Sequence, residues 1–294
     1  MMSIIIIVKD DPGVYDTLLG LKKIKKPEKT EILVVDASEG RLDHIKNKFP
    51  RVKWIYFYSK IDKATYPEQR NLGLKNARGD IIVFIDANCI PTPNWLIELT
   101  NPIKNEKEDI VAGYVKSKRG KSIHEISGDK NNNKRYLKEC PTINMAFKKS
   151  IIHKIGYFDE NLEAGEDLDF AWRAINAGYK IRYNQKAIIN HDWGNLKQEI
   201  KRARRYAAAK VRLYRKHHKI LRLFKYNEDL FVIYSIIYFL YVLSLIPITF
   251  FWRYYPVFLL IPIFKNLNKK IFTKLIFDFF WGFETLKELI FPKK

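Results

Sequence analysis

The chain has 294 residues and 47% of them are hydrophobic, which is enough for a full core and excludes disorder as its global state. A formal net charge of +21 indicates an anionic partner, and composition alone leaves nucleic acid, an acidic lipid surface and a phosphate-bearing substrate open. Two cysteines, Cys89 and Cys140, are too few for a disulfide framework and favour a reducing, cytoplasmic setting. The opening MMSIIIIVKDD has too short an apolar run for a signal peptide, so we expect a first strand there.

Short β-branched runs alternate with helical stretches up to about residue 195, a pattern typical of an α/β sheet layered with helices. The predicted strands are Ser3–Val8, Glu31–Val35, Val52–Tyr58, Asp80–Ile85, Ile110–Val115 and Thr142–Phe147.

Helix signals lie between these strands. Asp11 is predicted to cap a helix that has Pro12 at its first position, and Pro67 has the same place before a helix over 68–77. Gly178 follows a second predicted helix, over 166–177.

A basic segment follows, with twelve Lys or Arg between Lys197 and Lys225 against one acid, Glu199. Its apolar residues recur at three- and four-residue spacing, which predicts a basic amphipathic helix over residues 196–228. A solvated charged face is the alternative.

The next run, Leu230–Trp252, carries no charge and is long enough to cross a hydrocarbon core of about 30 Å. A shorter apolar piece, Tyr254–Phe264, follows Arg253, and basic residues flank both ends. We therefore expect a membrane hairpin over 229–265 with both ends in the cytoplasm. A re-entrant or in-plane arrangement and a buried core helix stay open. Residues 266–294 are predicted to form an amphipathic helix at the membrane interface.

Polar side chains follow two of the predicted strands. Asp36 comes after one of them, and Asp86 and Asn88 come after another. Ligands of α/β sheets gather beyond the carboxyl ends of the strands, and Arg70 and Asn71 lie in the helix between these two. No glycine-rich phosphate loop is present, so a phosphate would need a metal ion, Lys or Arg as counter-charge.

Several segments resemble, in this order, family 2 glycosyltransferases with a GT-A fold. They are ILVVDAS (32–38), EQRNLGLKNARGDIIVFIDAN (68–88), IPTPNWL (90–96), INMAFKKSIIHKIGYFDENLEAGEDLDFAWRAINAGYKIRYN (143–184) and NHDW (190–193). The resemblance covers about two-thirds of the chain and implies a GT-A catalytic domain over residues 1–195, a Rossmann-like mixed sheet flanked by helices.

The resemblance also implies a donor site for a nucleotide-diphosphate sugar, formed by Val8, Asp36, Arg70, Asn71, Asp86 and Ala87. Asp86-Ala87-Asn88 has the place of the family's Asp-x-Asp, which holds a divalent metal, Mn²⁺ or Mg²⁺. Asn88 departs from this pattern because an amide oxygen can coordinate a cation but brings no negative charge. His191 has the place of a further metal ligand, and an imidazole suits Mn²⁺ better than Mg²⁺.

Glu166 and Asp167 open a helix, where acidic residues are favoured by the helix dipole alone. The resemblance implies that one of them is the catalytic base, and we prefer Asp167, with Glu166 positioning the acceptor or acting as the alternative base. Asp169 and Arg173 are spaced for a simple ion pair. Asn144 resembles a family position that faces the active site, whereas Trp95 is more typical of a core.

Together these features predict an inverting glycosyltransferase at the cytoplasmic face of the cell membrane. The expected acceptor is a lipid-linked saccharide, in polysaccharide or glycoprotein glycan assembly, and the basic helix is expected to contact anionic lipid. The alternatives are transfer to a polyprenyl or dolichyl phosphate, and a catalytically silent membrane scaffold. Nucleic-acid binding is disfavoured because the basic helix leads directly into the apolar run.

Overall fold

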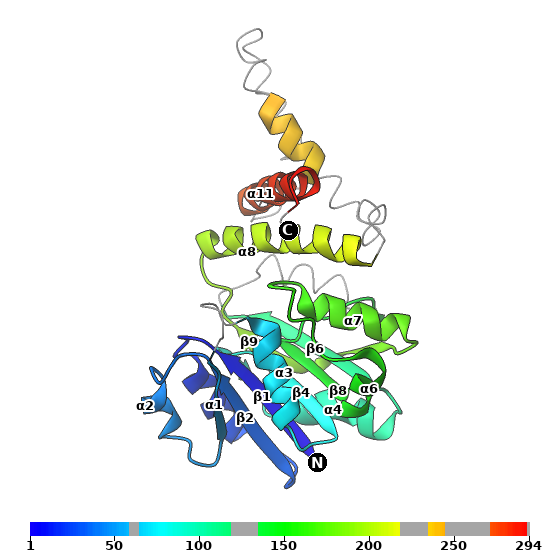
Figure 1. Ribbon diagram of the computed structural model, residues 1–294. Coiled ribbons are helices and arrows are strands. Elements are labelled where there is room, and N and C mark those ends of the chain that lie inside the picture. The colour runs from blue at the N-terminus through cyan, green and yellow to red at the C-terminus, as the bar shows by residue number, and fades with distance from the viewer. Residues whose placement is uncertain (59–64, 119–134, 218–234, 245–270, 293–294) are drawn as a thin grey trace. The chain divides into compact units, whose positions relative to one another are not determined.

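The computed structural model describes residues 1–58, 65–118, 135–217, 235–244 and 271–292 (Figure 1). By its internal contacts the chain divides into two compact units, Met1–Trp193 and Gly194–Lys294.

The first unit is built on a mixed β-sheet whose strands lie in the order β3-β2-β1-β4-β8-β6-β9-β5, with β7 pairing at the side of β9. The strands are β1 (Met2–Val8), β2 (Thr30–Asp36), β3 (Lys53–Tyr56), β4 (Ile81–Ile85), β5 (Cys89–Pro91), β6 (Ile110–Ser117), β7 (Tyr136–Leu137), β8 (Asn144–Lys148) and β9 (Ile181–His191).

The strand directions decide which residues share an edge of the sheet. β1, β2, β3 and β4 are mutually parallel, while β8 is antiparallel to both β4 and β6. β6 therefore runs in the direction of β4, and β9 is parallel to β6. As a result, the carboxyl ends of β1, β2, β4, β6 and β9 meet at one edge, here called the carboxyl edge.

Helices cover both faces of this sheet (Figure 1). Their bounds are α1 (Val14–Lys23), α2 (Asp43–Lys46), α3 (Tyr66–Asn76), α4 (Trp95–Asn105), the 3₁₀ turn η1 (Lys149–Ile151), α6 (Ile152–Ile155) and α7 (Glu166–Asn176). Alternate strand residues point to opposite faces, so Ile4 and Ile6 pack with α1 and α4 while Ile5 packs with α3, α6 and α7.

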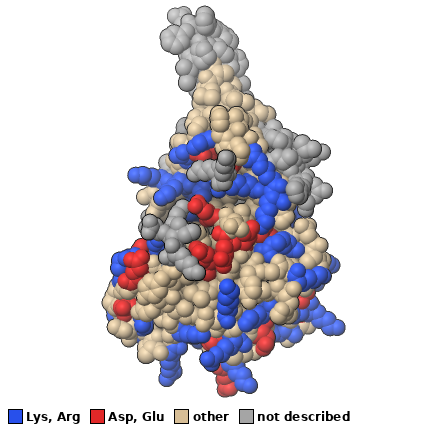
Figure 2. Space-filling model, viewed as in Figure 1, with Lys and Arg blue, Asp and Glu red and all other residues tan. Residues whose placement is uncertain are grey.

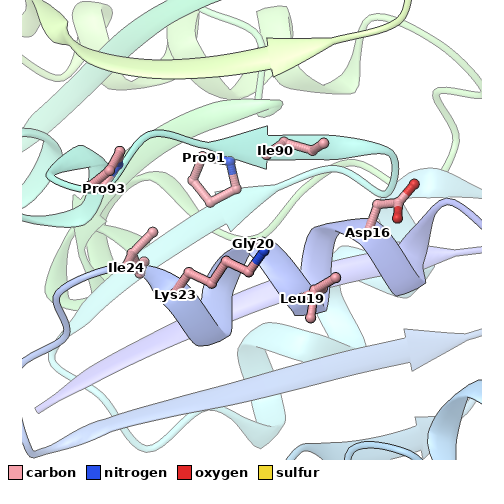
Figure 3. Close-up of a pocket in the computed structure, with 8 residues that line it drawn as sticks. All are labelled: Asp16, Leu19, Gly20, Lys23, Ile24, Ile90, Pro91 and Pro93. Carbon is pink, nitrogen blue, oxygen red and sulfur yellow. The ribbon is translucent and has the colours of Figure 1, made fainter.

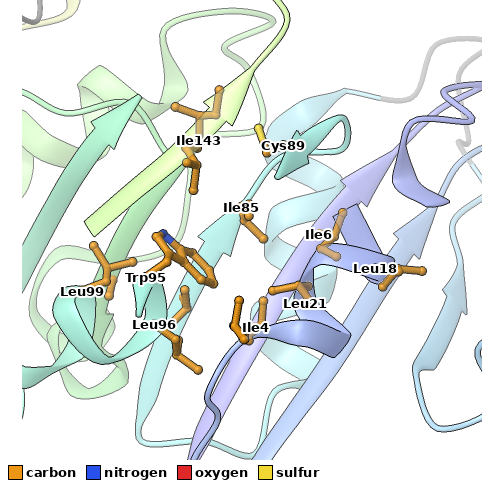
Figure 4. Packing of buried hydrophobic residues seen from close by; sticks show 14 of the residues in the cluster. Ile4, Ile6, Leu18, Leu21, Ile85, Cys89, Trp95, Leu96, Leu99 and Ile143 are labelled. Atoms are coloured by element: carbon orange, nitrogen blue, oxygen red, sulfur yellow. The ribbon is translucent and has the colours of Figure 1, made fainter. Parts of the chain in front are cut away.

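The first of these two cores contains Trp95, the first residue of α4, which is fully buried (Figure 4). Ile4, Ile6 and Leu21 belong to the same core and are branched aliphatic side chains. Each such side chain stabilises the fold by about 1.5–3 kcal/mol on burial, so this layer holds the strand ends firmly in place.

The second unit contains α8 (Leu196–Lys216), a helical segment over 235–244 and α11 (Ile271–Ile290). α8 begins at a capping box between Asn195 and Gln198, and it buries Ala203, Ala207 and Val211. A basic helix was predicted over residues 196–228; α8 covers 196–216 of this range, and 218–228 lie outside the described residues.

Each of the six predicted strands is present, with ends moved by one or two residues. β9 was missed because Arg182, Asn184 and Lys186 interrupt its apolar pattern. α1 begins at Val14 after Gly13, two residues later than predicted, and Asp11 Oδ1 accepts the Gly13 N–H at 2.8 Å.

Most of the predicted membrane hairpin, 229–265, lies outside the described residues. Within the part of the chain that is described, no helix has the length and apolar character needed to cross a bilayer.

Candidate active site

The carboxyl edge collects most of the residues singled out from the sequence. Val8 ends β1, Asp36 ends β2 and His191 ends β9, while Asp86 follows the last residue of β4. Because these strands run in one direction, sheet topology places four segments that are far apart in the sequence along one rim.

Asp36 is fully buried at this rim. Its carboxylate accepts hydrogen bonds from the Ser38 N–H at 2.7 Å and from Trp54 Nε1 at 3.0 Å. The carbonyl oxygen of Val8 accepts the N–H of Ala37 at 2.9 Å. These bonds hold the turns after β1 and β2 against each other, and they fix the position of the Asp36 carboxylate.

Arg70 lies at the centre of an acidic cluster. It is a residue of α3, a helix that begins after Thr65. The side chains of Thr65 and Glu68 form a capping box at this helix start. Arg70 Nη1 donates to Glu166, and Arg70 Nη2 lies 3.8 Å from Asp86 Oδ1. Burial disfavours the charged guanidinium, but the carboxylates of Glu166, Asp86 and Asp167 outweigh it and raise the pKa of Arg70.

Asp167 has the most strongly perturbed carboxyl of this cluster. It is the second residue of α7, which starts after Gly165 in a left-handed conformation at φ 80°. Burial and, next, the charge of Glu166 raise the pKa of Asp167 to about 7, although Arg70 opposes them. A carboxylate that titrates near neutrality is suited to take a proton from a hydroxyl.

Two buried side-chain amides, those of Asn71 and Asn144, form hydrogen bonds with the backbone near the site. Asn71 donates to the Phe158 carbonyl at 2.9 Å and to Glu160 at 2.8 Å, and its Oδ1 accepts the Phe158 N–H at 3.0 Å. Asn144 accepts from Trp95 Nε1 at 2.8 Å and donates to two carbonyls, of Tyr114 and Ala187. Both amides therefore hold backbone, and Trp95 is a core residue.

Asn88 has a left-handed backbone at φ 63°, a conformation that Asn tolerates better than most residues. Gly13 lies against it, since a Cβ on Gly13 would come within 2.7 Å of the Asn88 Cβ. On its other side, Asn88 Oδ1 accepts a hydrogen bond from Lys118 Nζ at 3.3 Å. Asn88 is thus confined between the turn before α1 and the end of β6.

His191 is paired with Cys89 across β5 and β9. Its Nδ1 lies 3.4 Å from the Cys89 Sγ, and Trp193 packs edge-on against the imidazole at 4.7 Å between ring centroids. Since Cys89 directly follows Asn88, this strand pair brings the imidazole next to the Asp86–Asn88 turn.

Asp86, Asn88 and His191 are the residues predicted to hold a divalent cation. Asp86 offers one carboxylate, Asn88 one amide oxygen and His191 one imidazole, a set that Mg²⁺ and Mn²⁺ accept. The described residues hold no group of three or more His, Cys, Asp and Glu side chains arranged for a metal. Asp86, Asn88 and His191 would give a divalent cation only one carboxylate, and so less negative charge than a site with two.

Two residues of this region were not singled out from the sequence. Lys118 gave no signal beyond following a strand, and Cys89 was considered only for disulfide chemistry. Their contacts depend on the β5–β9 and β6–β9 registers, and β5 and β9 are strands that the sequence pattern did not predict.

Acidic and basic side chains are unevenly distributed on the surface of the first unit. In Figure 2 acidic side chains gather at the centre of the visible face of the first unit, while Lys and Arg are spread over the rest of that face. A hollow of about 210 Å³ lies elsewhere, between α1 and β5 (Figure 3). Leu19, Gly20, Ile90 and Pro91 line it, and none of the predicted site residues does.

The fold is a mixed α/β sheet with a buried charged cluster at one edge, and comparison with known sequences supplies the family. The model described as "Glycosyl transferase family 2" matches residues 3–159, and one described as "Glycosyl transferase family group 2" matches residues 129–282. The chain belongs to glycosyl transferase family 2.

Curated relatives agree with this assignment. The chain is 28% identical over 136 residues to the pre-mycofactocin glycosyltransferase of Mycobacterium tuberculosis, covering 42% of this chain and 29% of that one. It is 26% identical over 179 residues to the glycosyltransferase AglE of Haloferax volcanii, covering 55% of this chain and 57% of that one. It therefore spans less than two-thirds of the length of these relatives.

A longer match is to a Methanococcus voltae protein named dolichyl N-acetyl-alpha-D-glucosaminyl phosphate 3-beta-D-2,3-diacetamido-2,3-dideoxy-beta-D-glucuronosyltransferase. It is 29% identical over 236 residues, 71% of this chain and 72% of that one.

Among solved structures, the mannosyltransferase PcManGT from Pyrobaculum calidifontis, in complex with GDP-Man and Mn²⁺, superposes with a TM-score of 0.76 at 15% identity. That match covers 99% of this chain and 88% of the other. TarS of S. aureus, residues 1–349, superposes with a TM-score of 0.55 at 19% identity, covering 77% and 72%. At these identities the likeness shows the fold, a GT-A type mixed α/β sheet with flanking helices.

Proposed function

We propose that this glycosyltransferase moves a sugar, with inversion, from a nucleoside-diphosphate sugar to a lipid-linked saccharide at the cytoplasmic face of the cell membrane. The observation that carries the proposal is the cluster of Arg70, Asp86, Glu166 and Asp167 at the carboxyl edge. In it one carboxyl, that of Asp167, has a pKa raised to about 7.

The proton step belongs to Asp167. Its carboxylate takes the proton of the acceptor hydroxyl while that oxygen forms a bond to the anomeric carbon of the donor sugar. The bond from this carbon to the diphosphate oxygen breaks, and its electron pair leaves with the nucleoside diphosphate. Glu166 is held by Arg70, so it is suited to positioning the acceptor.

The donor lies along the rim in this proposal, with its nucleoside near Val8 and Asp36 and its diphosphate near Asp86, Ala87 and Asn88. Asp86 and Asn88, with His191 beside them, would hold a divalent ion, and that ion would supply positive charge next to the departing diphosphate. Arg70 offsets the charge of Asp86 and Glu166, which keeps three carboxylates together at one site.

Names of the relatives support a lipid-linked acceptor. The Methanococcus voltae protein is named for a dolichyl-linked sugar phosphate, and a 21% identical Haloferax volcanii protein is named glucosyl-dolichyl phosphate glucuronosyltransferase. In the second unit, exposed basic residues of α8, such as Lys201, Arg205 and Lys216, are suited to anionic head-groups.

The test is transfer by the purified full chain, reconstituted in vesicles that contain anionic lipid. Radiolabelled UDP- and GDP-sugars are offered with Mn²⁺ to a polyprenyl-phosphate monosaccharide, to a polyprenyl-diphosphate monosaccharide or to bare polyprenyl phosphate. We expect label on a lipid-linked saccharide and not on the bare phosphate.

Label on bare polyprenyl phosphate alone would favour transfer to the lipid phosphate. If neither transfer nor donor hydrolysis is observed with any donor, that result would favour a silent membrane scaffold. Transfer in detergent that is unchanged by anionic lipid would count against the membrane part of the proposal.

A further inference from the structure

The Asp86–Asn88 turn has less negative charge than a turn with two aspartates. Asp86 brings one negative charge and Asn88 brings none, so a divalent ion there would be held by a single protein carboxylate. The diphosphate of a donor carries negative charge of its own that must be balanced. The described residues offer one further cation next to Asn88, the ammonium of Lys118.

Lys118 makes a hydrogen bond through its backbone and another through its side chain. It follows the last residue of β6, and its N–H donates to the His191 carbonyl at 3.0 Å. Its Nζ lies 3.3 Å from Asn88 Oδ1. The ammonium also acts on the interior, because it partly opposes the burial that raises the pKa of the Cys89 thiol well above its usual range.

Resting on the proposed function, we propose that Lys118 Nζ is a second cationic ligand for the donor diphosphate, so that nucleotide binding persists without a metal ion. An ammonium has three N–H donors, and Asn88 takes one of them. The remaining two are suited to phosphate oxygens. Charge-assisted hydrogen bonds of this kind are among the stronger ones in proteins.

The amide at position 88 has a direct consequence for Lys118. An aspartate there would form an ion pair with Lys118 and compete with phosphate for its charge. Asn88 orients the ammonium through a hydrogen bond and leaves its charge available to the donor. Arg70 cannot replace it in this role, because its guanidinium already faces Glu166 and Asp86.

The test measures binding of UDP and GDP by calorimetry to the full chain, in EDTA and in Mn²⁺. For the nucleotide that binds wild type, we expect Lys118→Met to weaken affinity in EDTA by roughly 10- to 100-fold, the range for a lost hydrogen bond to a charged group. Lys118→Arg should keep most of the affinity. Binding of the corresponding nucleoside, which lacks phosphate, should not change.

Lys104→Met is the matched control, because Lys104 is exposed on α4 and lines a hollow at the opposite edge of the sheet with Met1 and Asp80. A second variant, Asn88→Asp, should weaken nucleotide affinity in EDTA, measured by calorimetry. It should also tighten Mn²⁺ binding, measured by electron paramagnetic resonance.

Equal affinity of wild type and Lys118→Met in EDTA would overturn the role of Lys118, and so would wild-type binding that requires Mn²⁺. Failure of wild type to bind any nucleoside diphosphate under either condition would instead overturn the proposed function.

Discussion

Arginine–glutamate pairs occur in both units of the molecule, but their surroundings differ. In the second unit, Arg204 donates to Glu284 at 2.7 Å and Arg212 donates to Glu288 at 3.1 Å, so α8 and α11 are joined by matched pairs. In the first unit, Arg70 and Glu166 are almost fully buried, and the same guanidinium also faces Asp86 and Asp167.

This difference separates a structural use of charge from a functional one. Matched pairs between helices offset the desolvation of each partner and fix how the helices pack. Three carboxylates around one guanidinium leave an excess of negative charge, and burial together with this charge raises the pKa of Asp167. Clusters of this kind are typical of active sites, where a perturbed pKa serves the chemistry.

The largest expected effect is on transfer. Asp167→Asn removes the proton acceptor and should lower turnover by about 100- to 10,000-fold, the usual range for a general base. Nucleotide affinity should stay within about twofold, since that part of the rim is untouched. The measurement is sugar transfer together with calorimetry of nucleotide binding.

Asp109→Asn is the matched control for this variant. Asp109 precedes β6, at the opposite edge of the sheet, and pairs with Lys148 at 2.8 Å. Turnover of Asp167→Asn close to that of this control would remove Asp167 from the mechanism.

The second prediction compares the two kinds of ion pair directly. Arg70→Met leaves the buried Glu166 without its partner and should lower the free energy of unfolding by about 3–5 kcal/mol. Arg204→Met, in a pair whose arginine side chain is 45% exposed, should lower it by about 1 kcal/mol or less. Urea unfolding measures both.

A double variant, Arg70→Met with Glu166→Gln, should recover part of the loss because it removes the unpaired charge. Equal losses for Arg70→Met and Arg204→Met would show that the two pairs do not differ as argued.

The third prediction concerns pH. A base with a pKa of about 7 is protonated below that value, so kcat/KM should fall about tenfold per pH unit on the acidic side. After burial, the charge of Glu166 is the largest cause of this raised pKa. Glu166→Gln removes that charge, so the acidic limb of the kcat/KM profile should move to lower pH. A wild-type limb near pH 4 would contradict the raised pKa of Asp167.

Much of the sheet was predictable because its central strands are continuous apolar runs rich in β-branched residues, such as Ile4–Val8 and Ile81–Ile85. Strand order was not, and the antiparallel β8 between β4 and β6 has no local signature. β9 could not be predicted from its pattern, since polar residues alternate irregularly along it.

The site was predictable in its residue types and much less in its contacts. Motif order identified Asp86, Glu166 and Asp167 as candidates, and their individual roles stay predictions. The bond between Arg70 and Glu166 joins residues 96 apart, and Lys118 meets Asn88 across 30 residues. Such pairings depend on how the strands and helices pack, which no local sequence pattern records.

The last prediction is a gain in stability from the same change that removes activity. The pKa of Asp167 is about 7 in the folded chain, against about 3.9 for an unfolded aspartate. The folded state therefore binds the proton more tightly, and stability from this group is lost as pH rises from about 4 to 7. The amide introduced by Asp167→Asn cannot ionise, so this variant should unfold at a higher temperature than wild type at pH 8.

Each kcal/mol gained in this way should raise the unfolding temperature by roughly 2–4 °C, and the difference should shrink towards pH 4. Scanning calorimetry at pH 5 and pH 8 measures it. Asp109→Asn, which changes a partly exposed pair, should show no gain that grows with pH. If Asp167→Asn shifts the unfolding temperature equally at both pH values, the pKa of the Asp167 carboxyl is not raised in the folded chain. This rim would then not differ in that respect from the matched pairs of the second unit.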